Sequence, residues 1–245
     1  MSTTAALHSE WIKIRATRSV LGSLLAVLGV TVGLTVVACA AFGEAESDNA
    51  DFDPLFTVFY GLNFGQIAAL AYGTTAVSGE YHGGAIRVSL AAVPRRRVFY
   101  AAKLLAVGGP ALAVGLVTGL AGFLAGGAFL GGTRVGLGDP GAVRAVVGSG
   151  IYLALMALLA AGLTMLLRSG VAVLSLLIPF LLIVSFVVGD LATGAARFLP
   201  DRAGQLVLHT SPDGGLDPWA GLAVTACWAA AAVLAGWWRL ERDDA

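Results

Sequence analysis

The most basic interruption of an otherwise very apolar chain is the segment of residues 79–103. Within it, apolar residues recur at helical spacing and predict a short amphipathic helix, which Pro94 should end. An arginine cluster follows. A helix lying along a membrane surface beside arginines offers a docking face to a soluble partner, whereas a loop that only orients the protein by its charge explains the same pattern. The residues concerned are Glu80, Ile86, Arg87, Leu90, Val93, Arg95, Arg96 and Arg97.

Residue types that carry out catalysis or bind metals do not converge in this sequence. His8, His82 and His209 are scattered and form no HExxH pattern or grouped ligand set. The GxxxxGK[ST] phosphate-binding loop is absent from the sequence, which argues against ATP hydrolysis by that route. Cys39 and Cys227 fall in different apolar runs and are interpreted as small packing residues rather than as a disulfide. We therefore expect no catalytic residue, no metal site and no cofactor in this chain.

The composition excludes an ordinary soluble domain. Of the 245 residues, 58% are hydrophobic and 12% are charged, and the mean hydropathy is +0.84. Apolar runs of spanning length predict an all-α, polytopic integral membrane protein with six transmembrane helices. The expected spans are residues 20–42, 55–77, 100–130, 143–167, 171–188 and 219–238.

The sequence also predicts an N-terminal helix, a C-terminal tail, two bent spans and a hairpin. Residues 1–19 carry Leu7, Trp11 and Ile14 on one helical stripe and predict an interfacial amphipathic helix, and residues 239–245 form a short charged tail. Prolines should bend two spans, at Gly108-Gly109-Pro110 and at Pro179. Residues 190–216 fit a re-entrant or surface-lying hairpin.

The positive charges fall mainly on one side of the predicted membrane. Six spans place both termini on the same side as the segment of residues 79–103, and this side collects eleven of the fifteen cations. The other side carries an acidic loop, residues 44–53. By the positive-inside rule, both termini and the basic segment are cytoplasmic. Because arginine outnumbers lysine and Ala, Gly and Val abound, we expect a multi-pass protein of a bacterial plasma membrane.

Polar side chains form a stripe along the second predicted span. Asn63, Gln66 and Thr74 share one helical face, which Leu70 interrupts midway. In lipid, such a stripe must face other helices or a water-filled path. Interhelical hydrogen bonding is one interpretation, and a translocation path is the other.

Two motifs give the chain a resemblance to ABC-type-2 transporter permeases, the membrane-spanning subunits of bacterial ABC exporters. The residues L-H-S-E-W-I-K at positions 7–13 resemble the L-x-S-E-x-x-K opening of small permeases of this type. The motifs S-G-E-Y at positions 78–81, I-R-V-S-L at positions 86–90 and P-R-R at positions 94–96 resemble their loop after the second span. The resemblance extends over the whole chain. One departure is Gly84-Ala85, where such permeases carry Gly-Thr before the isoleucine, so a capping hydroxyl is missing from the loop helix.

The resemblance implies a non-enzymatic permease that pairs as a homodimer or heterodimer. Each copy would bind a separately encoded ABC ATPase, which holds the ATP and Mg²⁺, through the segment of residues 79–103. The export of a small amphipathic molecule, drug, peptide or lipid-like compound is the expected activity, with residues 190–216 as an outer gate. The alternative is a non-transporting membrane subunit that anchors or assembles a cytoplasmic partner. Neither interpretation involves nucleic acid. The implied ATPase-coupling residues are Glu80, Ile86, Arg87, Leu90, Val93, Arg95, Arg96 and Arg97, and the path candidates are Asn63, Gln66 and Thr74.

Overall fold

The computed structural model describes residues 3–42, 52–81, 83–93, 95–130, 135–184, 194, 196–210 and 215–242. All the regular elements within those ranges are helices, which confirms the all-α prediction for this part of the chain. The longer elements are α1 (Thr3–Ala16), α2 (Arg18–Phe42), α4 (Leu62–Ser78), α6 (Arg96–Phe129), α7 (Ala142–Leu167), α8 (Gly170–Pro179) and α11 (Pro218–Arg242). The short ones are α3 (Pro54–Thr57), η1 (Gly79–Tyr81), α5 (Ala85–Ala92), η2 (Phe180–Val184), η3 (Ala196–Phe198), α10 (Pro200–Gln205) and η4 (Leu206–Leu208).

Four of the described helices, α2, α6, α7 and α11, are long and apolar enough to cross a bilayer. They correspond to the predicted first, third, fourth and sixth spans. The helices at the second and fifth predicted spans are shorter, with 17 residues in α4 and 10 in α8. At 1.5 Å per residue α4 is about 25 Å long, slightly less than the about 30 Å of a hydrocarbon core. The structure thus gives four clear spans of the predicted six.

The second predicted span is not one continuous helix. Asp53 accepts hydrogen bonds from the backbone amides of Leu55 and Phe56 and so caps the separate helix α3. The chain then turns, and α4 begins only at Leu62. At the turn Gly61 packs so closely on α2 that a Cβ atom there would lie 2.0 Å from the Thr31 carbonyl oxygen. The break therefore lets the backbone approach α2.

Prolines act differently in the two helices that contain them. Helix α6 continues through Pro110 as one helix of 34 residues. Helix α8 ends at Pro179, and five residues of π-helix follow in η2. The second proline therefore changes the helix type at the predicted place, as the loss of a backbone donor allows. The end of the predicted fifth span, beyond Val184, lies outside the described residues.

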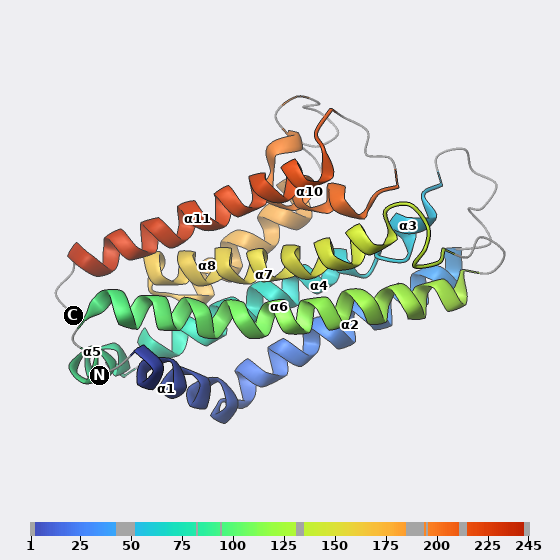
Figure 1. The fold of residues 1–245 in the computed structure, drawn as a ribbon. Helices are drawn as coiled ribbons and strands as arrows, with labels where there is room; N and C mark the ends of the chain where they lie inside the picture. Colours follow the sequence, from blue (N-terminus) through green and yellow to red (C-terminus); the bar gives the residue numbers. More distant parts are fainter. Residues whose placement is uncertain are drawn as a thin grey trace.

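Helix α7 forms the centre of the bundle, between α4, α6 and α11 (Figure 1). Small residues let these helices approach closely. A Cβ on Gly73 of α4 would lie 2.0 Å from the Ala157 carbonyl oxygen, and Gly115 of α6 meets Gly150 in the same manner. Gly115 is thus a packing position between α6 and α7.

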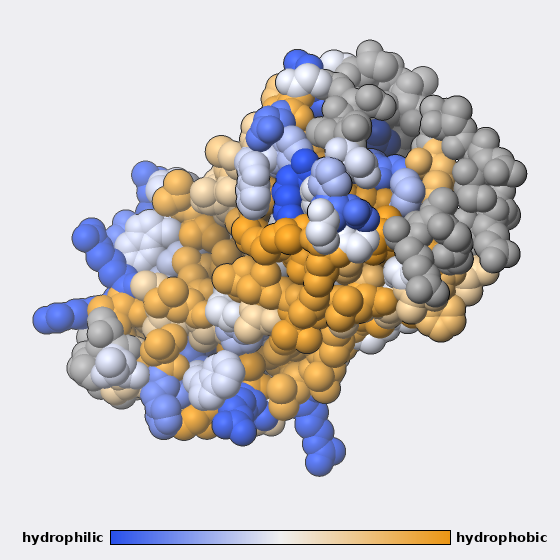
Figure 2. All heavy atoms as spheres, turned by 45° about the vertical axis from the view of Figure 1, so that its right-hand side comes forward, coloured by the Kyte–Doolittle hydropathy of each residue, from blue (hydrophilic) through white to orange (hydrophobic). Residues whose placement is uncertain are grey.

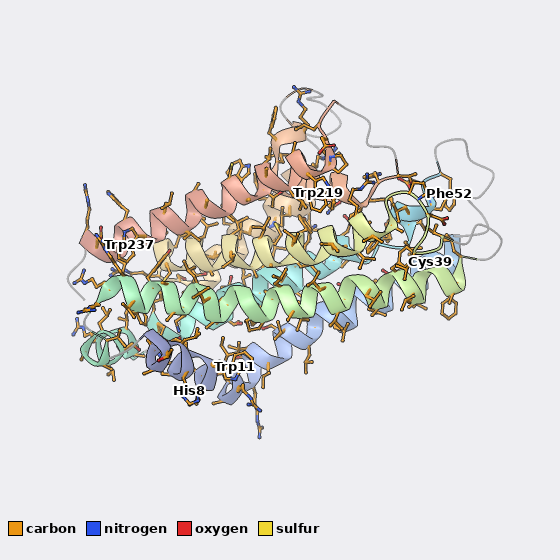
Figure 3. All side chains as sticks on the ribbon, viewed as in Figure 1. His8, Trp11, Cys39, Phe52, Trp219 and Trp237 are labelled. Carbon is orange, nitrogen blue, oxygen red and sulfur yellow. The ribbon has the colours of Figure 1, made fainter. Side chains whose placement is uncertain are left out.

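The elements that carry most of the cations lie at one end of the bundle. Helices α1 and α5, the start of α6 and the end of α11 meet there, while α3 lies at the opposite end (Figure 1). We call the first of these the cationic end. A broad apolar surface covers the long helices (Figure 2). Trp219 and Trp237 mark opposite halves of α11 (Figure 3), as expected of aromatic residues near the two membrane interfaces.

Alanine at position 73 should separate α4 from α7, because its Cβ would overlap the Ala157 carbonyl oxygen. We expect Gly73→Ala to lower the unfolding free energy by about 1–3 kcal/mol, seen as a lower unfolding temperature in mild detergent. Gly29→Ala is the matched control, since no heavy atom lies within 4 Å of a Cβ placed there. Equal unfolding temperatures for the two variants would contradict this packing.

Candidate functional site

Four charged side chains from three distant parts of the chain meet at the cationic end, and two of them belong to the basic segment itself. Lys103 of α6 lies between two carboxylates, with its Nζ 2.7 Å from Glu80 Oε1 and in contact with Glu10 Oε2. Lys13 Nζ lies 2.8 Å from an oxygen of each glutamate. We call Glu10, Lys13, Glu80 and Lys103 the buried charge cluster. It joins α1, η1 and α6.

Three members of the buried charge cluster are shielded from solvent. Lys103, Glu80 and Glu10 are 2%, 5% and 3% exposed, whereas the Lys13 side chain is 42% exposed. Two positive and two negative charges compensate each other, which is the condition for burying charges at tolerable cost. Because removal of one member strands another in the interior, the elements that carry them are held in one arrangement.

Helix α5 is attached to the cluster by Ser89. The Ser89 hydroxyl donates to Glu80 Oε2 over 2.8 Å, and Lys13 Nζ donates to Ser89 Oγ over 3.0 Å. Half-buried Ile86 and Leu90 pack on the neighbouring apolar core. The short amphipathic helix is therefore present as predicted, and its apolar face is turned toward its own protein.

The contacts within the cluster favour the charged forms of Glu80 and Lys13. Burial alone would raise the pKa of Glu80, but the Lys103 charge and hydrogen bonds from Lys103, Lys13 and Ser89 lower it to about 2. Burial likewise opposes the charged form of Lys13, yet contacts with Glu10 and Glu80 raise its pKa above the usual value. Both groups stay ionised around neutral pH.

The structure divides the eight predicted coupling residues into an inner and an outer group. Glu80 belongs to the buried charge cluster, Val93 is buried directly after α5, and Ile86 and Leu90 are half-buried on the inner face of α5. Arg87 is exposed, and so is Val88 at 72%, although Val88 also borders a cavity that Lys13, Glu80 and Lys103 line. Val88 was not among the predicted residues. The surface that α5 presents is thus Arg87 and Val88 with the neighbouring alanines.

The three consecutive arginines also differ in their surroundings. Arg96 Nη1 donates to the carbonyl oxygens of Leu240 over 2.6 Å and Glu241 over 3.2 Å, and so ties the start of α6 to the end of α11. Arg95 and Arg97 are exposed. Pro94, predicted to end the loop helix, lies outside the described residues, and α5 ends at Ala92. Gly84 caps α5 with a φ of 75° and no side-chain hydrogen bond, consistent with the missing hydroxyl at position 85.

The path candidates in α4 make contacts between helices or within α4. Buried Gln66 accepts a hydrogen bond from the Tyr152 hydroxyl of α7, and its Nε2 donates to the Asn63 carbonyl oxygen over 3.0 Å. Thr74 is buried against Gly170 of α8, where a Cβ would lie 3.1 Å from its methyl group. Asn63 is half-buried. Packing accounts for these contacts of Gln66 and Thr74, and the assignment of all three to a path stays a prediction.

At the opposite end, Asp53 fastens residues 196–210 to α3. Thr210 donates to its carboxylate through the backbone amide and the hydroxyl, over 2.9 and 2.7 Å, and His209 Nδ1 lies 3.3 Å away. Burial opposes the charged form, but the contacts with His209 and Thr210 outweigh it and hold the pKa of Asp53 below its usual range. From α7, Arg144 donates to the carbonyl oxygens of Val207 and His209. The described part of the predicted hairpin thus packs into the end of the bundle.

Residues 6–190 match the sequence model of the family described as ABC-2 family transporter protein. The match covers most of the chain. The chain belongs to the ABC-2 transporter family. A comparison with curated proteins returned no match. As an ABC-2 family protein with several apolar helices of spanning length, it is a multi-pass membrane protein and a component of membrane transport.

The buried charge cluster lies wholly within the ABC-2 family region, whereas α10 and α11 follow it. Sequence reasoning missed the cluster. Glu10 and Lys13 were visible as a pair three residues apart on one helix, but no sequence pattern joins them to positions 80 and 103. Lys103 was counted as one more surface cation, and its burial at 2% exposure shows a different role.

Removal of the central ammonium should strongly destabilise the cationic end. We expect Lys103→Met to cost about 3–5 kcal/mol, because it leaves two buried carboxylates with only Lys13 to compensate them. Lys13→Met should cost less, since that side chain is 42% exposed. Unfolding temperatures in detergent measure both effects. Adding Glu80→Gln to Lys103→Met should restore part of the loss, and a further additive loss would contradict the pairing.

The lowered pKa of Glu80 predicts a dependence of stability on pH. A carboxylate whose pKa falls from 4.5 to about 2 on folding stabilises the fold fully above pH 4.5, and this contribution is lost as the pH falls toward 2. The unfolding temperature should therefore be level from neutral pH to about 4.5 and fall below it. In Glu80→Gln, the part of this decrease in unfolding temperature that protonation of Glu80 causes should be absent. The same acid dependence in both proteins would show that other groups cause it.

Proposed function

We propose that this chain is the permease subunit of an ATP-driven ABC exporter powered by a separate ATPase subunit, which binds the ATP and Mg²⁺. Its cationic end faces the cytoplasm of a bacterial plasma membrane, in accord with the positive-inside rule. The observation that carries the proposal is an outward-facing α5 fixed to the transmembrane helices by the buried charge cluster. Membership of the ABC-2 family supports it.

The docking face on α5 consists of Arg87, Val88 and Ala91, all of them exposed. A cation beside an apolar side chain suits a partner groove that offers a carboxylate and a hydrophobic contact. Ile86, Leu90 and Val93 act indirectly, because they hold α5 in place. Glu80 has the same positioning role.

A force on α5 has a continuous route into the membrane. The Ser89 hydroxyl is hydrogen-bonded to Glu80, which directly follows α4, and Glu80 is bonded to Lys103 of α6. These contacts would transmit the force. Tyr100 and Arg96 extend the route to α11, since the Tyr100 hydroxyl donates to the Val233 carbonyl oxygen over 2.5 Å. ATP-driven movement of the partner would thereby tilt several helices together.

The cargo path is proposed to lie where two permease copies, identical or related, meet in the bilayer. Asn63, Gln66 and Thr74 are its candidates on α4, and residues 190–216 form the outer gate. These candidates are neutral, so a small amphipathic molecule, drug, peptide or lipid-like compound fits them better than a strongly charged one. Opening such a path requires the Gln66–Tyr152 contact to rearrange.

The second candidate function is a non-transporting subunit that anchors or assembles a cytoplasmic partner. One observation favours it: Gln66 is engaged in a hydrogen bond with Tyr152 of α7. An anchor needs the docking face of α5 but no path. Transport activity separates the two functions.

A charge reversal on the docking face should release the ATPase. We expect Arg87→Glu combined with Val88→Glu to abolish co-purification of a phosphate-loop ATPase from native membranes, identified by mass spectrometry and ATPase activity. Arg18→Glu is the matched control, an exposed cation at the same end outside α5, and it should retain the ATPase. Retention by the double variant would overturn the docking face. Absence of any ATPase from the unaltered protein would favour the anchor.

A further inference from the structure

An apolar groove runs between α6 and α11 on the outside of the bundle. Both helices pack along α7, and the space between them has a volume of about 610 Å³. Small residues leave this space open, among them Gly108 and Gly109 of α6 and Ala226 and Ala230 of α11. A Cβ on Gly109 would meet no atom within 4 Å. The small residues of α6 and α11 thus create the groove.

The chemistry of the walls restricts what the groove can hold. The lining residues are all glycine, alanine or a larger aliphatic residue, and they include Leu105, Leu112 and Leu158. All of them belong to α6, α7 and α11, three of the helices suited to cross the membrane. A polar ligand would find no hydrogen-bonding side chain there. The part of the occupant that enters the groove is therefore hydrocarbon.

The groove is closed toward the cationic end by aromatic side chains. The Tyr100 hydroxyl donates to the Val233 carbonyl oxygen, and the Tyr100 ring meets the Trp237 ring edge-on at 5.4 Å. These contacts join α6 to α11 at the level expected for a membrane interface, where tyrosine and tryptophan accumulate. A hydrocarbon chain in the groove would therefore turn outward here, so that its headgroup would lie at the membrane interface.

Arg97 stands beyond this closure, on the same face of α6. From Arg97, steps of four, four and three residues lead through Ala101 and Leu105 to Gly108, so these positions share one helical stripe. Arg97 precedes Leu105 by eight residues, about 12 Å along the helix. Its side chain is exposed, and the neighbouring Arg96 is engaged with α11. Arg97 thus adds a cation at headgroup depth above the apolar groove.

We propose that the groove between α6, α7 and α11 binds an acyl chain of an anionic phospholipid whose phosphate is held by Arg97. A guanidinium binds phosphate oxygens through charge-assisted, often bidentate hydrogen bonds. Arg239 and Arg242 lie in the last turn of α11 at the same end, together with Glu241. The site does not depend on the proposed transport function.

A second copy of the chain fits the groove less well. Two copies related by a two-fold axis along the membrane normal place equivalent residues at the same depth. The arginines at the start of α6 would then face their equivalents across the contact, and like charges opposed in this way are unfavourable. An anionic headgroup compensates the same charge. The charge distribution therefore favours a lipid.

Two variants test the two halves of the site. Arg97→Gln removes the cation, and Ala230→Leu fills the groove from an exposed position on α11. Arg95→Gln and Ala231→Leu are the controls, since both residues are exposed neighbours that do not line the groove. Each protein, purified in mild detergent, is titrated with phosphatidylglycerol and with phosphatidylcholine, and bound lipid is counted by native mass spectrometry.

We expect the unaltered protein and both controls to retain phosphatidylglycerol in preference to phosphatidylcholine. Arg97→Gln should weaken phosphatidylglycerol binding by about tenfold, the loss expected for a hydrogen bond to a charged group. Ala230→Leu should weaken the binding of both lipids. Equal retention by Arg97→Gln or Ala230→Leu would overturn the proposal, as would an equal loss with Arg95→Gln. A dimer that Ala230→Leu alone dissociates, without a change in bound lipid, would assign the groove to a second copy.

Discussion

The ammonium group of Lys103, held between two buried carboxylates, is the interaction on which the cationic end of this protein depends. Glu10, Glu80 and Lys103 come from elements far apart in the sequence, and each is almost completely buried. A charge in such a place is tolerated only when its partners are present. The position of α1 therefore depends on α6, that of η1 depends on both, and α5 follows through Ser89. The apolar contacts of these short elements add stability, but they do not specify one arrangement as the charges do.

The rest of the molecule is held together by other means. In the membrane-spanning region, glycines and alanines of α4, α6, α7 and α11 allow close contact, because hydrocarbon provides little hydrophobic driving force between helices. At the opposite end, one carboxylate again joins distant elements: Asp53 caps α3 and binds Thr210. Both ends are thus held by charged side chains with several partners, and the membrane-spanning middle is held by the close packing of small residues.

Sequence reasoning recovered the features that depend on local pattern. The all-α class, the helices at residues 142–167 and 218–242, the amphipathic α5 and the accumulation of cations at one end follow from hydropathy and periodicity. It missed what depends on tertiary contact. The second predicted span is broken between α3 and α4, where Gly61 lies against α2, and a hydropathy profile does not detect such a contact. The buried charge cluster was missed for a similar reason. The sequence around Lys103 does not indicate whether its ammonium group lies at the surface or between two buried carboxylates.

The division of α5 into two faces follows from these constraints and changes how coupling would operate. An amphipathic helix at a membrane surface first satisfies its apolar face against its own protein, so its polar face is left for a partner. Because Ser89 and Glu80 attach α5 to α6, we expect the two helices to move together. Helix α6 has 34 residues and is about 50 Å long, so a tilt of about 5° at its base would displace its far end by about 4 Å. In the proposed coupling, a small tilt driven at the docking face would therefore reach the opposite end through α6 itself, without a flexible linker.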